Sequence, residues 1–264
     1  MTTPTDVTFS THGHSGDLEL AVNHSPSSRT GDVPHIMFCG GFHSAMQGTK
    51  GSALSTLCRE HDWHYTRFDY RGHGQSGGDP AGFTLADWLD DTLAILDQQQ
   101  MPTVLVGSSM GAWLATLAGL RRPDSVKALM LIAAAPDFVQ ELVVPNLSVA
   151  EVWDLQQGQI VDRANDYDTP HPITQALLDS AKPLSLLDGE VLQTLHCPIR
   201  LIHGTGDTDV PYELAARLMD KLPPQHDARL SLLHDADHRL SDERSLSYIE
   251  QELITLINTL YEQS

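Results

Sequence analysis

The chain has 264 residues and a formal net charge of −19 at pH 7, because 35 Asp and Glu outweigh 16 Lys and Arg. Nucleic acids and anionic membranes are bound mainly through clusters of Lys and Arg, so this charge argues against both as partners. The sequence also holds no apolar run near the roughly 20 residues that a membrane-spanning helix requires. We therefore expect a protein with one substantial core and with neither a nucleic acid nor a membrane as its partner.

The three cysteines indicate neither a disulfide framework nor a zinc site. Cys39, Cys58 and Cys197 lie far apart and show no C-x-x-C spacing. The first residues lack the charged and apolar regions of a secretory signal and the arginines of a transit peptide. We expect a soluble cytoplasmic protein, and the sequence carries no signal for an oligomeric state.

Predicted strands and helices alternate along most of the chain. Apolar runs indicate strands at 5–10, 17–24, 35–39, 64–68, 103–106, 127–132, 199–202 and 229–233. Helical spacing of apolar residues indicates helices at 51–61, 84–98, 110–121, 212–221 and 242–261. Such alternation is typical of an α/β fold with a mostly parallel central sheet and helices on both faces.

Between residues 136 and 195 the alternation stops. The region contains two helical stretches, 149–156 and 173–181, and the prolines Pro145, Pro170, Pro172 and Pro183. We interpret 136–195 as an inserted cap or lid. Residues 1–135 and 196–264 then form the core that the cap interrupts.

A G-x-S-x-G motif at 107–111 lies between the predicted strand 103–106 and the predicted helix that follows. In this motif the serine occupies a sharp strand-to-helix turn that exposes its hydroxyl, and the flanking glycines allow the backbone segments to approach closely. This context makes Ser109 a candidate nucleophile.

Serine is a poor nucleophile at neutral pH, so it requires a base and a third group that orients the base. Asp207 follows the predicted strand 199–202, and His238 follows the predicted strand 229–233. The carboxyl ends of parallel strands share one edge of a sheet, so Ser109, Asp207 and His238 are expected to converge there. Their order along the chain is the order stated for the α/β-hydrolase triad. Two alternatives remain open: Asp209 as the acid and His234 as the base.

Acyl transfer also requires donors for the developing oxyanion. The backbone N–H of Met110, directly after the nucleophile, is one candidate. The backbone N–H of Phe42 is the second, because the glycines at 40 and 41 permit a tight turn after the strand 35–39.

These motifs closely resemble those of the α/β-hydrolase superfamily. Residues 68–76 match its segment F-D-x-R-G-x-G-x-S, and residues 203–211 match its acid loop H-G-x-x-D-x-x-V-P. A narrower likeness is to the mitochondrial palmitoyl-protein thioesterases, also described as acyl-glucuronide esterases; it is carried by 41–42, 46–50, 107–109, 197–201 and 237–239. The resemblance implies an α/β-hydrolase fold, Ser109 as nucleophile, Asp207 as acid, His238 as base, and acyl ester or thioester substrates.

An acyl chain needs apolar walls, and five residues are candidates for them. They are Met46, Phe138, Leu142, Val143 and Trp153. We expect no metal and no organic cofactor; His12 and His14 could bind a metal but lack a third ligand nearby.

The sequence thus predicts a serine hydrolase that cleaves carboxylic ester or thioester bonds through an acyl-enzyme intermediate. Peptide cleavage, perhydrolysis and carbon–carbon bond hydrolysis are alternatives on the same fold. A non-catalytic binding protein that has kept the scaffold is the alternative from another class.

Overall fold

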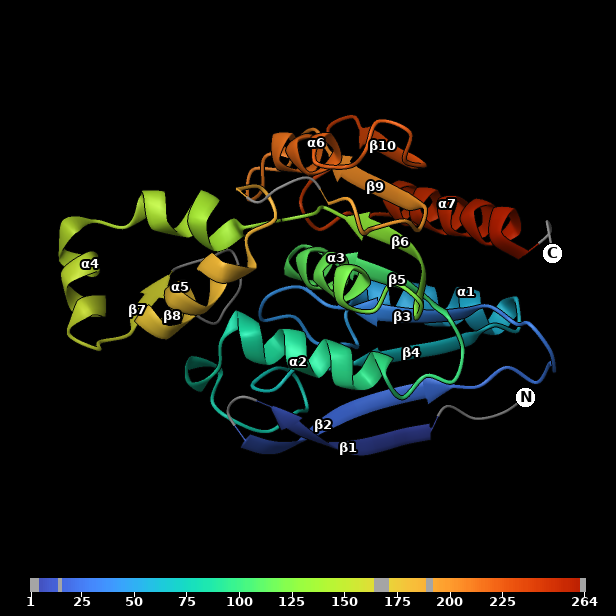
Figure 1. Ribbon diagram of the computed structural model, residues 1–264, viewed down its shortest axis with the longest axis horizontal. Coiled ribbons are helices and arrows are strands. Elements are labelled where there is room, and N and C mark those ends of the chain that lie inside the picture. Colours follow the sequence, from blue (N-terminus) through green and yellow to red (C-terminus); the bar gives the residue numbers. More distant parts are fainter. Residues whose placement is uncertain (1–4, 14–15, 164–170, 189–191, 262–264) are drawn as a thin grey trace.

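An eight-stranded sheet forms the centre of the molecule in the computed structural model, which describes residues 5–13, 16–163, 171–188 and 192–261. Its order is β1-β2-β4-β3-β5-β6-β9-β10 (Figure 1). The strands are β1 (Thr5–Gly13), β2 (Gly16–Ser25), β3 (His35–Cys39), β4 (His64–Phe68), β5 (Thr103–Ser108), β6 (Val126–Ile132), β9 (Ile199–Gly204) and β10 (Ala228–Leu233). From β4 to β10 all neighbouring strands pair in parallel, whereas β2 is antiparallel to both β1 and β4. The predicted α/β fold with a mostly parallel sheet is confirmed.

Helices cover both faces of the sheet (Figure 1). One face packs against α1 (Thr49–Glu60) and α7 (Glu243–Tyr261), and the other against α2 (Leu85–Leu96), α3 (Met110–Arg121) and α6 (Tyr212–Asp220). The two faces carry separate apolar clusters, so the sheet is buried on both sides, as parallel sheets are. None of the helices that the structure describes is long and apolar enough to cross a membrane.

The segment between β6 and β9 lies outside the eight-stranded sheet. Its elements are η2 (Val139–Val143), η3 (Val144–Asn146), α4 (Val149–Gln156), β7 (Val161–Arg163), β8 (His171–Ile173), α5 (Gln175–Ala181) and η4 (Lys182–Leu184). Figure 1 shows this segment beyond the carboxyl ends of the parallel strands, at the left. Its hydrogen bonds to the core include one from the Leu85 N–H to the Ser180 hydroxyl at 3.2 Å and one from Trp113 Nε1 to the Leu184 carbonyl at 3.0 Å. Arg217 on α6 also donates to the Glu141 carboxylate, at 2.7 and 2.8 Å.

The helix predicted at 173–181 begins two residues later, at Gln175, because the Thr174 side chain caps it and accepts from the Leu177 N–H at 3.1 Å. Two residues named in the sequence predictions, His14 and Pro170, lie outside the described residues.

The amino end of α2 is closed by a capping box. The Thr84 side chain accepts from the Asp87 N–H, and the Asp87 carboxylate accepts from the Thr84 N–H at 2.9 Å. We expect Thr84→Ala to lower the free energy of unfolding by about 1 kcal/mol, because it removes the partner of an amide at the helix end. Urea unfolding measures this loss. Thr259→Ala, at an exposed position of α7, is the matched control; equal losses in the two variants would contradict the assignment.

Candidate active site

Ser109 lies on a strained turn between β5 and α3. Its backbone has φ 56° and ψ −119°, a conformation that costs energy for a residue with a side chain. A Cβ atom at Gly107 would lie 2.4 Å from the Gly111 carbonyl oxygen, and one at Gly111 would lie 2.1 Å from the Cys39 carbonyl oxygen. Only glycine fits at these two positions. The motif therefore has its glycines where strand and helix approach most closely.

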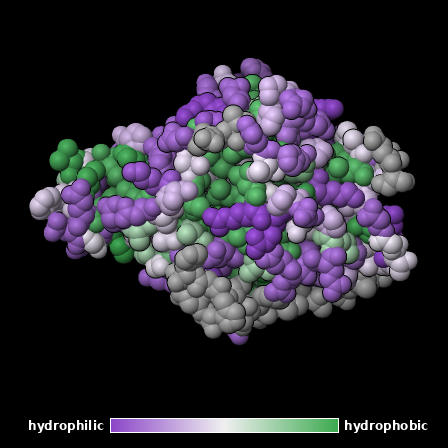
Figure 2. Space-filling model, viewed as in Figure 1, coloured by the Kyte–Doolittle hydropathy of each residue, from purple (hydrophilic) through white to green (hydrophobic). Residues whose placement is uncertain are grey.

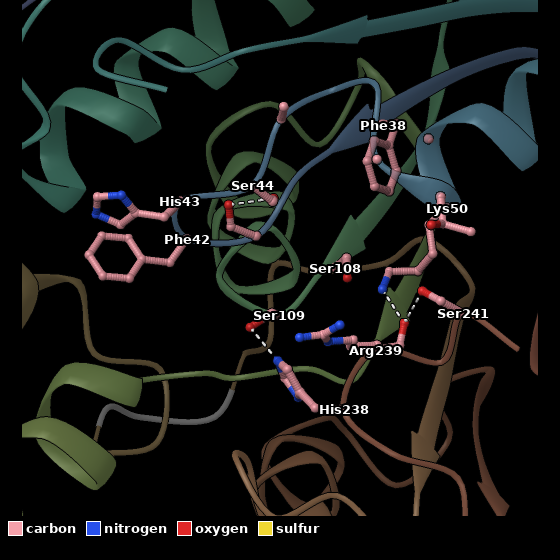
Figure 3. Close-up of a pocket in the computed structure, with 15 residues that line it drawn as sticks. Phe38, Phe42, His43, Ser44, Lys50, Ser108, Ser109, His238, Arg239 and Ser241 are labelled. Atoms are coloured by element: carbon pink, nitrogen blue, oxygen red, sulfur yellow. Dashed lines mark hydrogen bonds between the residues drawn. The ribbon is translucent and has the colours of Figure 1, made fainter. Parts of the chain in front are cut away.

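The structure brings the side chains of Ser109, His238 and Asp207 into one line of hydrogen bonds. His238 Nε2 lies 3.1 Å from Ser109 Oγ, and His238 Nδ1 lies 2.7 Å from Asp207 Oδ2 (Figure 3 draws the first of these contacts). An ionised carboxylate only accepts, so Nδ1 carries the proton and Nε2 can accept the proton of the serine hydroxyl. The three residues follow β5, β9 and β10, at the edge where the carboxyl ends of these strands meet.

The two alternative residues lie elsewhere. Asp209 is exposed, and its backbone N–H donates to Asp207 Oδ1 at 3.0 Å. His234 is also exposed and pairs with Asp235, with 3.3 Å between His234 Nε2 and Asp235 Oδ2. Within the described part of the chain neither side chain hydrogen-bonds to Ser109, so the geometry favours Asp207 and His238.

The carboxylate of Asp207 is fully buried and accepts four hydrogen bonds. Its Oδ1 accepts from the N–H groups of Asp209 and Val210 at 3.0 and 2.8 Å, and its Oδ2 accepts from His238 and His203 at 2.7 and 3.0 Å. Burial raises the pKa of Asp207, but the hydrogen bonds from His203 and His238 outweigh it and hold the pKa well below its usual range. The group therefore stays ionised beside His238.

The loop that carries His238 is tied to α1. Lys50 Nζ donates to the Arg239 carbonyl oxygen, a contact between residues far apart in the sequence (Figure 3). Burial lowers the pKa of Lys50 to about 8, against the opposing influence of Asp237 and Asp207. Lys50 therefore fixes the position of this loop, and its ammonium group loses its proton at a lower pH than that of an ordinary lysine.

The backbone after β3 lies against the nucleophile. A Cβ atom built at Gly41 would be 3.4 Å from Ser109 Cβ, so the turn that leads into Phe42 borders the serine. Met110 is the first residue of α3 and directly follows Ser109. Both residues proposed as oxyanion donors are therefore next to the serine along the chain or in space.

Asp69 fixes the loop after β3 through a hydrogen bond to its backbone. Its Oδ1 accepts from the Met46 N–H at 2.6 Å, and its Oδ2 accepts from the Gln75 N–H at 2.8 Å. Burial raises the pKa of Asp69, and these backbone donors oppose that rise. One carboxylate thereby connects the loop after β3 with the loop after β4.

A cavity of about 310 Å³ opens at Ser109. Its lining residues are Phe38, Gly41, Phe42, His43, Ser44, Ala45, Gly48, Thr49, Lys50, Gly51, Ser108, Ser109, His238, Arg239 and Ser241. Figure 3 shows Phe42 and His43 on one side of Ser109, and Lys50 and Arg239 on the other. Among these described residues there are two cations and no Asp or Glu, in a chain whose net charge is −19.

The five residues predicted as acyl walls do not line this cavity. The ring centroid of Phe138 lies 5.6 Å from that of Phe42, which lines the cavity. Met46 is buried, and Leu142 and Val143 pack partly buried on the core cluster of α2 and α3. Trp153 is 62% exposed on α4, so the structure does not bring it to the cavity.

Sequence reasoning missed two residues at this site, His203 and Lys50. His203 belongs to the H-G motif used to find Asp207, and its ring contacts that carboxylate. Lys50 belongs to a segment used only for the family likeness. Within the described part of the chain, no group of three or more His, Cys, Asp or Glu side chains is arranged to hold a metal ion.

Comparison with known proteins agrees with this geometry. The family described as serine aminopeptidase, S33, matches residues 34–165. Palmitoyl-protein thioesterase ABHD10, mitochondrial, from Mus musculus is 32% identical over 233 residues, covering 87% of this chain and 77% of the relative. A pimeloyl-[acyl-carrier protein] methyl ester esterase from Chromobacterium violaceum is 29% identical over 196 residues, covering 64% of this chain and 74% of the relative.

Solved structures extend the likeness to the fold. A protein described as a hydrolase from Agrobacterium vitis superposes with a TM-score of 0.91 at 29% identity, covering 97% of this chain and 100% of that one. The mouse α/β hydrolase domain-containing protein 10 superposes with a TM-score of 0.84 at 27% identity, covering 98% and 100%. The chain therefore belongs to the α/β-hydrolase family described as serine aminopeptidase, S33, and to the same family as palmitoyl-protein thioesterase ABHD10.

Proposed function

We propose that this chain is a serine hydrolase that cleaves carboxylic ester and thioester bonds of small molecules through an acyl-enzyme. The observation that carries the proposal is the contact of 3.1 Å between Ser109 Oγ and His238 Nε2, with Asp207 bound to the other ring nitrogen. The family likeness to a palmitoyl-protein thioesterase supports ester-type bonds as substrates.

The first half of the reaction uses the triad as nucleophile, base and orienting acid. Ser109 Oγ attacks the acyl carbon while His238 Nε2 takes the hydroxyl proton, and the ionised Asp207 stabilises the imidazolium that forms. The backbone N–H groups of Phe42 and Met110 bind the oxyanion; such a donor is worth about 3 kcal/mol of transition-state stabilisation. His238 then gives its proton to the departing alcohol or thiol. Water repeats the sequence in the second half and releases the acid.

We propose that residues 136–195 act as a cap on a core formed by 1–135 and 196–264. The segment begins shortly after β6 and lies beyond the carboxyl ends of the parallel strands (Figure 1), and Ser109 directly follows the carboxyl end of β5. Phe138, Leu142 and Val143 are its candidates for contact with the acyl chain, with Met46 on the core side. Trp153 is exposed to solvent on α4 and is not one of these candidates. A cytoplasmic location stays a prediction from the sequence.

A turnover panel tests the proposal. Purified protein is offered short and long p-nitrophenyl esters, acyl thioesters and an aminoacyl anilide, and the released acid or amine is measured. We expect the esters and thioesters to be hydrolysed, with a burst of product when deacylation is slow. Hydrolysis of the anilide alone, or no turnover by folded protein, would contradict it.

The cations of the cavity predict a preference for anionic substrates. We expect Lys50→Met to raise KM about tenfold for an ester whose leaving group bears a carboxylate, relative to its neutral analogue, because one ion pair at a partly buried site is worth about 1–2 kcal/mol. The ratio of the two KM values cancels any general damage to the loop. Since the pKa of Lys50 is lowered to about 8, the wild-type preference should also decline above pH 8 as the ammonium loses its proton.

Lys127→Met is the matched control. Lys127 lies on β6, pairs with Asp32 at 3.6 Å and covers the ring of Tyr261, away from the cavity. An equal KM ratio in wild type and Lys50→Met would refute the role of this cation.

A further inference from the structure

His203 is a buried histidine in contact with the carboxylate that orients the base. It is the second-last residue of β9 and has no exposed surface. Its Nε2 lies 3.0 Å from Asp207 Oδ2 and 3.0 Å from the Val210 carbonyl oxygen. The same Oδ2 lies 2.7 Å from His238 Nδ1. Two imidazole rings thus share one oxygen of the acid.

The surroundings of His203 determine which of its nitrogens carries the proton. A carbonyl oxygen and an ionised carboxylate only accept hydrogen bonds, so Nε2 must be the donor. Nδ1 is buried and has no hydrogen-bond partner among the described residues. A second proton on Nδ1 would therefore be a buried donor without an acceptor, which is unfavourable. His203 is therefore held with its Nε2–H directed at Asp207.

We infer that His203 is a positioning residue for the triad, which fixes the rotation of the Asp207 carboxylate and limits how strongly that carboxylate retains a proton on His238. The inference rests on the proposed function. Two effects follow from the geometry.

The first effect concerns orientation. The carboxylate is held at Oδ1 by two backbone N–H groups, those of Asp209 and Val210, and at Oδ2 by two rings. Because His203 also donates to the Val210 carbonyl, it ties the acid to its own loop. Without it, Oδ2 would be held by His238 alone among these four donors, and the carboxylate would gain rotational freedom that the bonded His238 ring would share, so the base would be less well aligned with Ser109.

The second effect concerns charge. A donor on Oδ2 draws off part of the negative charge that stabilises the imidazolium of His238. Removing that donor strengthens the attraction between Asp207 and protonated His238, so the base would stay protonated to higher pH. Lys50, whose charge interacts with that of Asp207, is unchanged by a substitution at 203, and so are Asp237 and Arg239, whose charges act on Lys50. A structural filler would not produce such a change in the pH profile.

Two substitutions separate the donor from the volume of the ring. His203→Phe removes the donor and keeps a planar ring, whereas His203→Gln places an amide N–H near the position of Nε2. We expect His203→Phe to lower kcat by roughly 10- to 100-fold, a loss typical of a misplaced catalytic group, with KM within about twofold. The acid limb of its pH–rate profile should move to higher pH. His203→Gln should recover most of kcat and the wild-type limb.

A matched control is His35→Gln. His35 is also buried and also bonded through both ring nitrogens, but at the amino end of β3, at the opposite edge of the sheet. We expect this variant to keep the wild-type acid limb. Parallel assays of wild type and Ser109→Ala establish the hydrolase activity independently, so loss of the proposed function would be seen before any result at 203.

Two results would overturn the inference. One is a folded His203→Phe variant with the wild-type kcat and acid limb. The other is an equal loss in both variants with an unmoved limb, which identifies a purely structural role. If His203→Phe does not fold, nitrogen NMR of the wild-type protein decides: the inference requires the His203 proton on Nε2, and a ring protonated on Nδ1 instead would refute it.

Discussion

Ser109→Ala is expected to lower kcat for a p-nitrophenyl ester by roughly 10⁴- to 10⁶-fold, because it removes the atom that forms the acyl-enzyme. The binding of substrate and the fold should change little, since Ser109 makes its turn through the backbone. Circular dichroism and steady-state kinetics on the same preparation measure both.

The matched control is Ser231→Ala. Ser231 lies on β10, where its hydroxyl accepts from the Tyr248 hydroxyl at 2.9 Å, and it does not line the cavity. We expect it to keep kcat within about twofold of wild type. Retention of more than a tenth of the activity by Ser109→Ala would assign the chemistry to another nucleophile.

Acidification is expected to destabilise the fold through a cluster of three histidines, His24, His35 and His64, whose ring centroids lie 5.9 to 6.4 Å apart. Burial lowers the pKa of His35 from 6.5 to about 3, and burial also lowers the pKa values of His24 and His64. All three groups resist protonation in the folded state.

The hydrogen bonds of His35 explain why the addition of a second proton to its ring is unfavourable. The Thr103 hydroxyl donates to the Met101 carbonyl, so His35 Nδ1 must donate to Thr103 Oγ1, at 2.9 Å. His35 Nε2 then accepts from the Thr66 hydroxyl, also at 2.9 Å. A second proton on His35 would turn Nε2 from an acceptor into a donor, and the Thr66 hydroxyl would have to give up its own donation to accept from it.

The sign of the pH effect follows from linkage. Between pH 6.5 and 3 the unfolded chain binds more protons than the folded one, so stability is complete above pH 6.5 and is lost as the pH falls. Each pKa unit corresponds to about 1.4 kcal/mol, so His35 alone should cost about 2 kcal/mol between pH 6.5 and 5. Urea unfolding at the two pH values measures the loss.

His35→Leu should remove most of this pH dependence, whereas His196→Leu, at an exposed position, should keep it. The same loss of stability in wild type and His35→Leu between pH 6.5 and 5 would contradict the assignment. The cluster lies at the amino ends of β3 and β4, whereas Ser109 follows the carboxyl end of β5, so the effect concerns stability rather than catalysis.

Local pattern in the sequence was sufficient to predict the strands and helices of the core. The apolar runs of β3 and β5 and the helical stripe of α7 are buried where the pattern requires, because a sheet covered on both faces leaves few other arrangements. The motif around Ser109 was equally informative, because within five residues it has glycine at the two positions where a Cβ atom would clash with neighbouring backbone.

Contacts set by tertiary register could not be predicted in this way. His24 lies opposite Thr66 only because of the register of β2 on β4, and His35 lies opposite His64 only because of the register of β3 on β4. The contact of His203 with Asp207 likewise depends on the turn after β9. Trp153 shows the same limit, because the pattern of an eight-residue helix does not indicate which face of the helix is covered by the rest of the protein. Figure 2 shows apolar side chains exposed at the end of the molecule where α4 lies.

Labelling with a fluorophosphonate probe tests the central claim most directly, because the probe reacts with an activated serine and traps it covalently. Intact-mass analysis and peptide mapping should find one adduct per chain, on Ser109, and labelling should be lost in Ser109→Ala and His238→Ala. Folded wild-type protein that takes up no probe, or takes it up at another residue, would contradict the account.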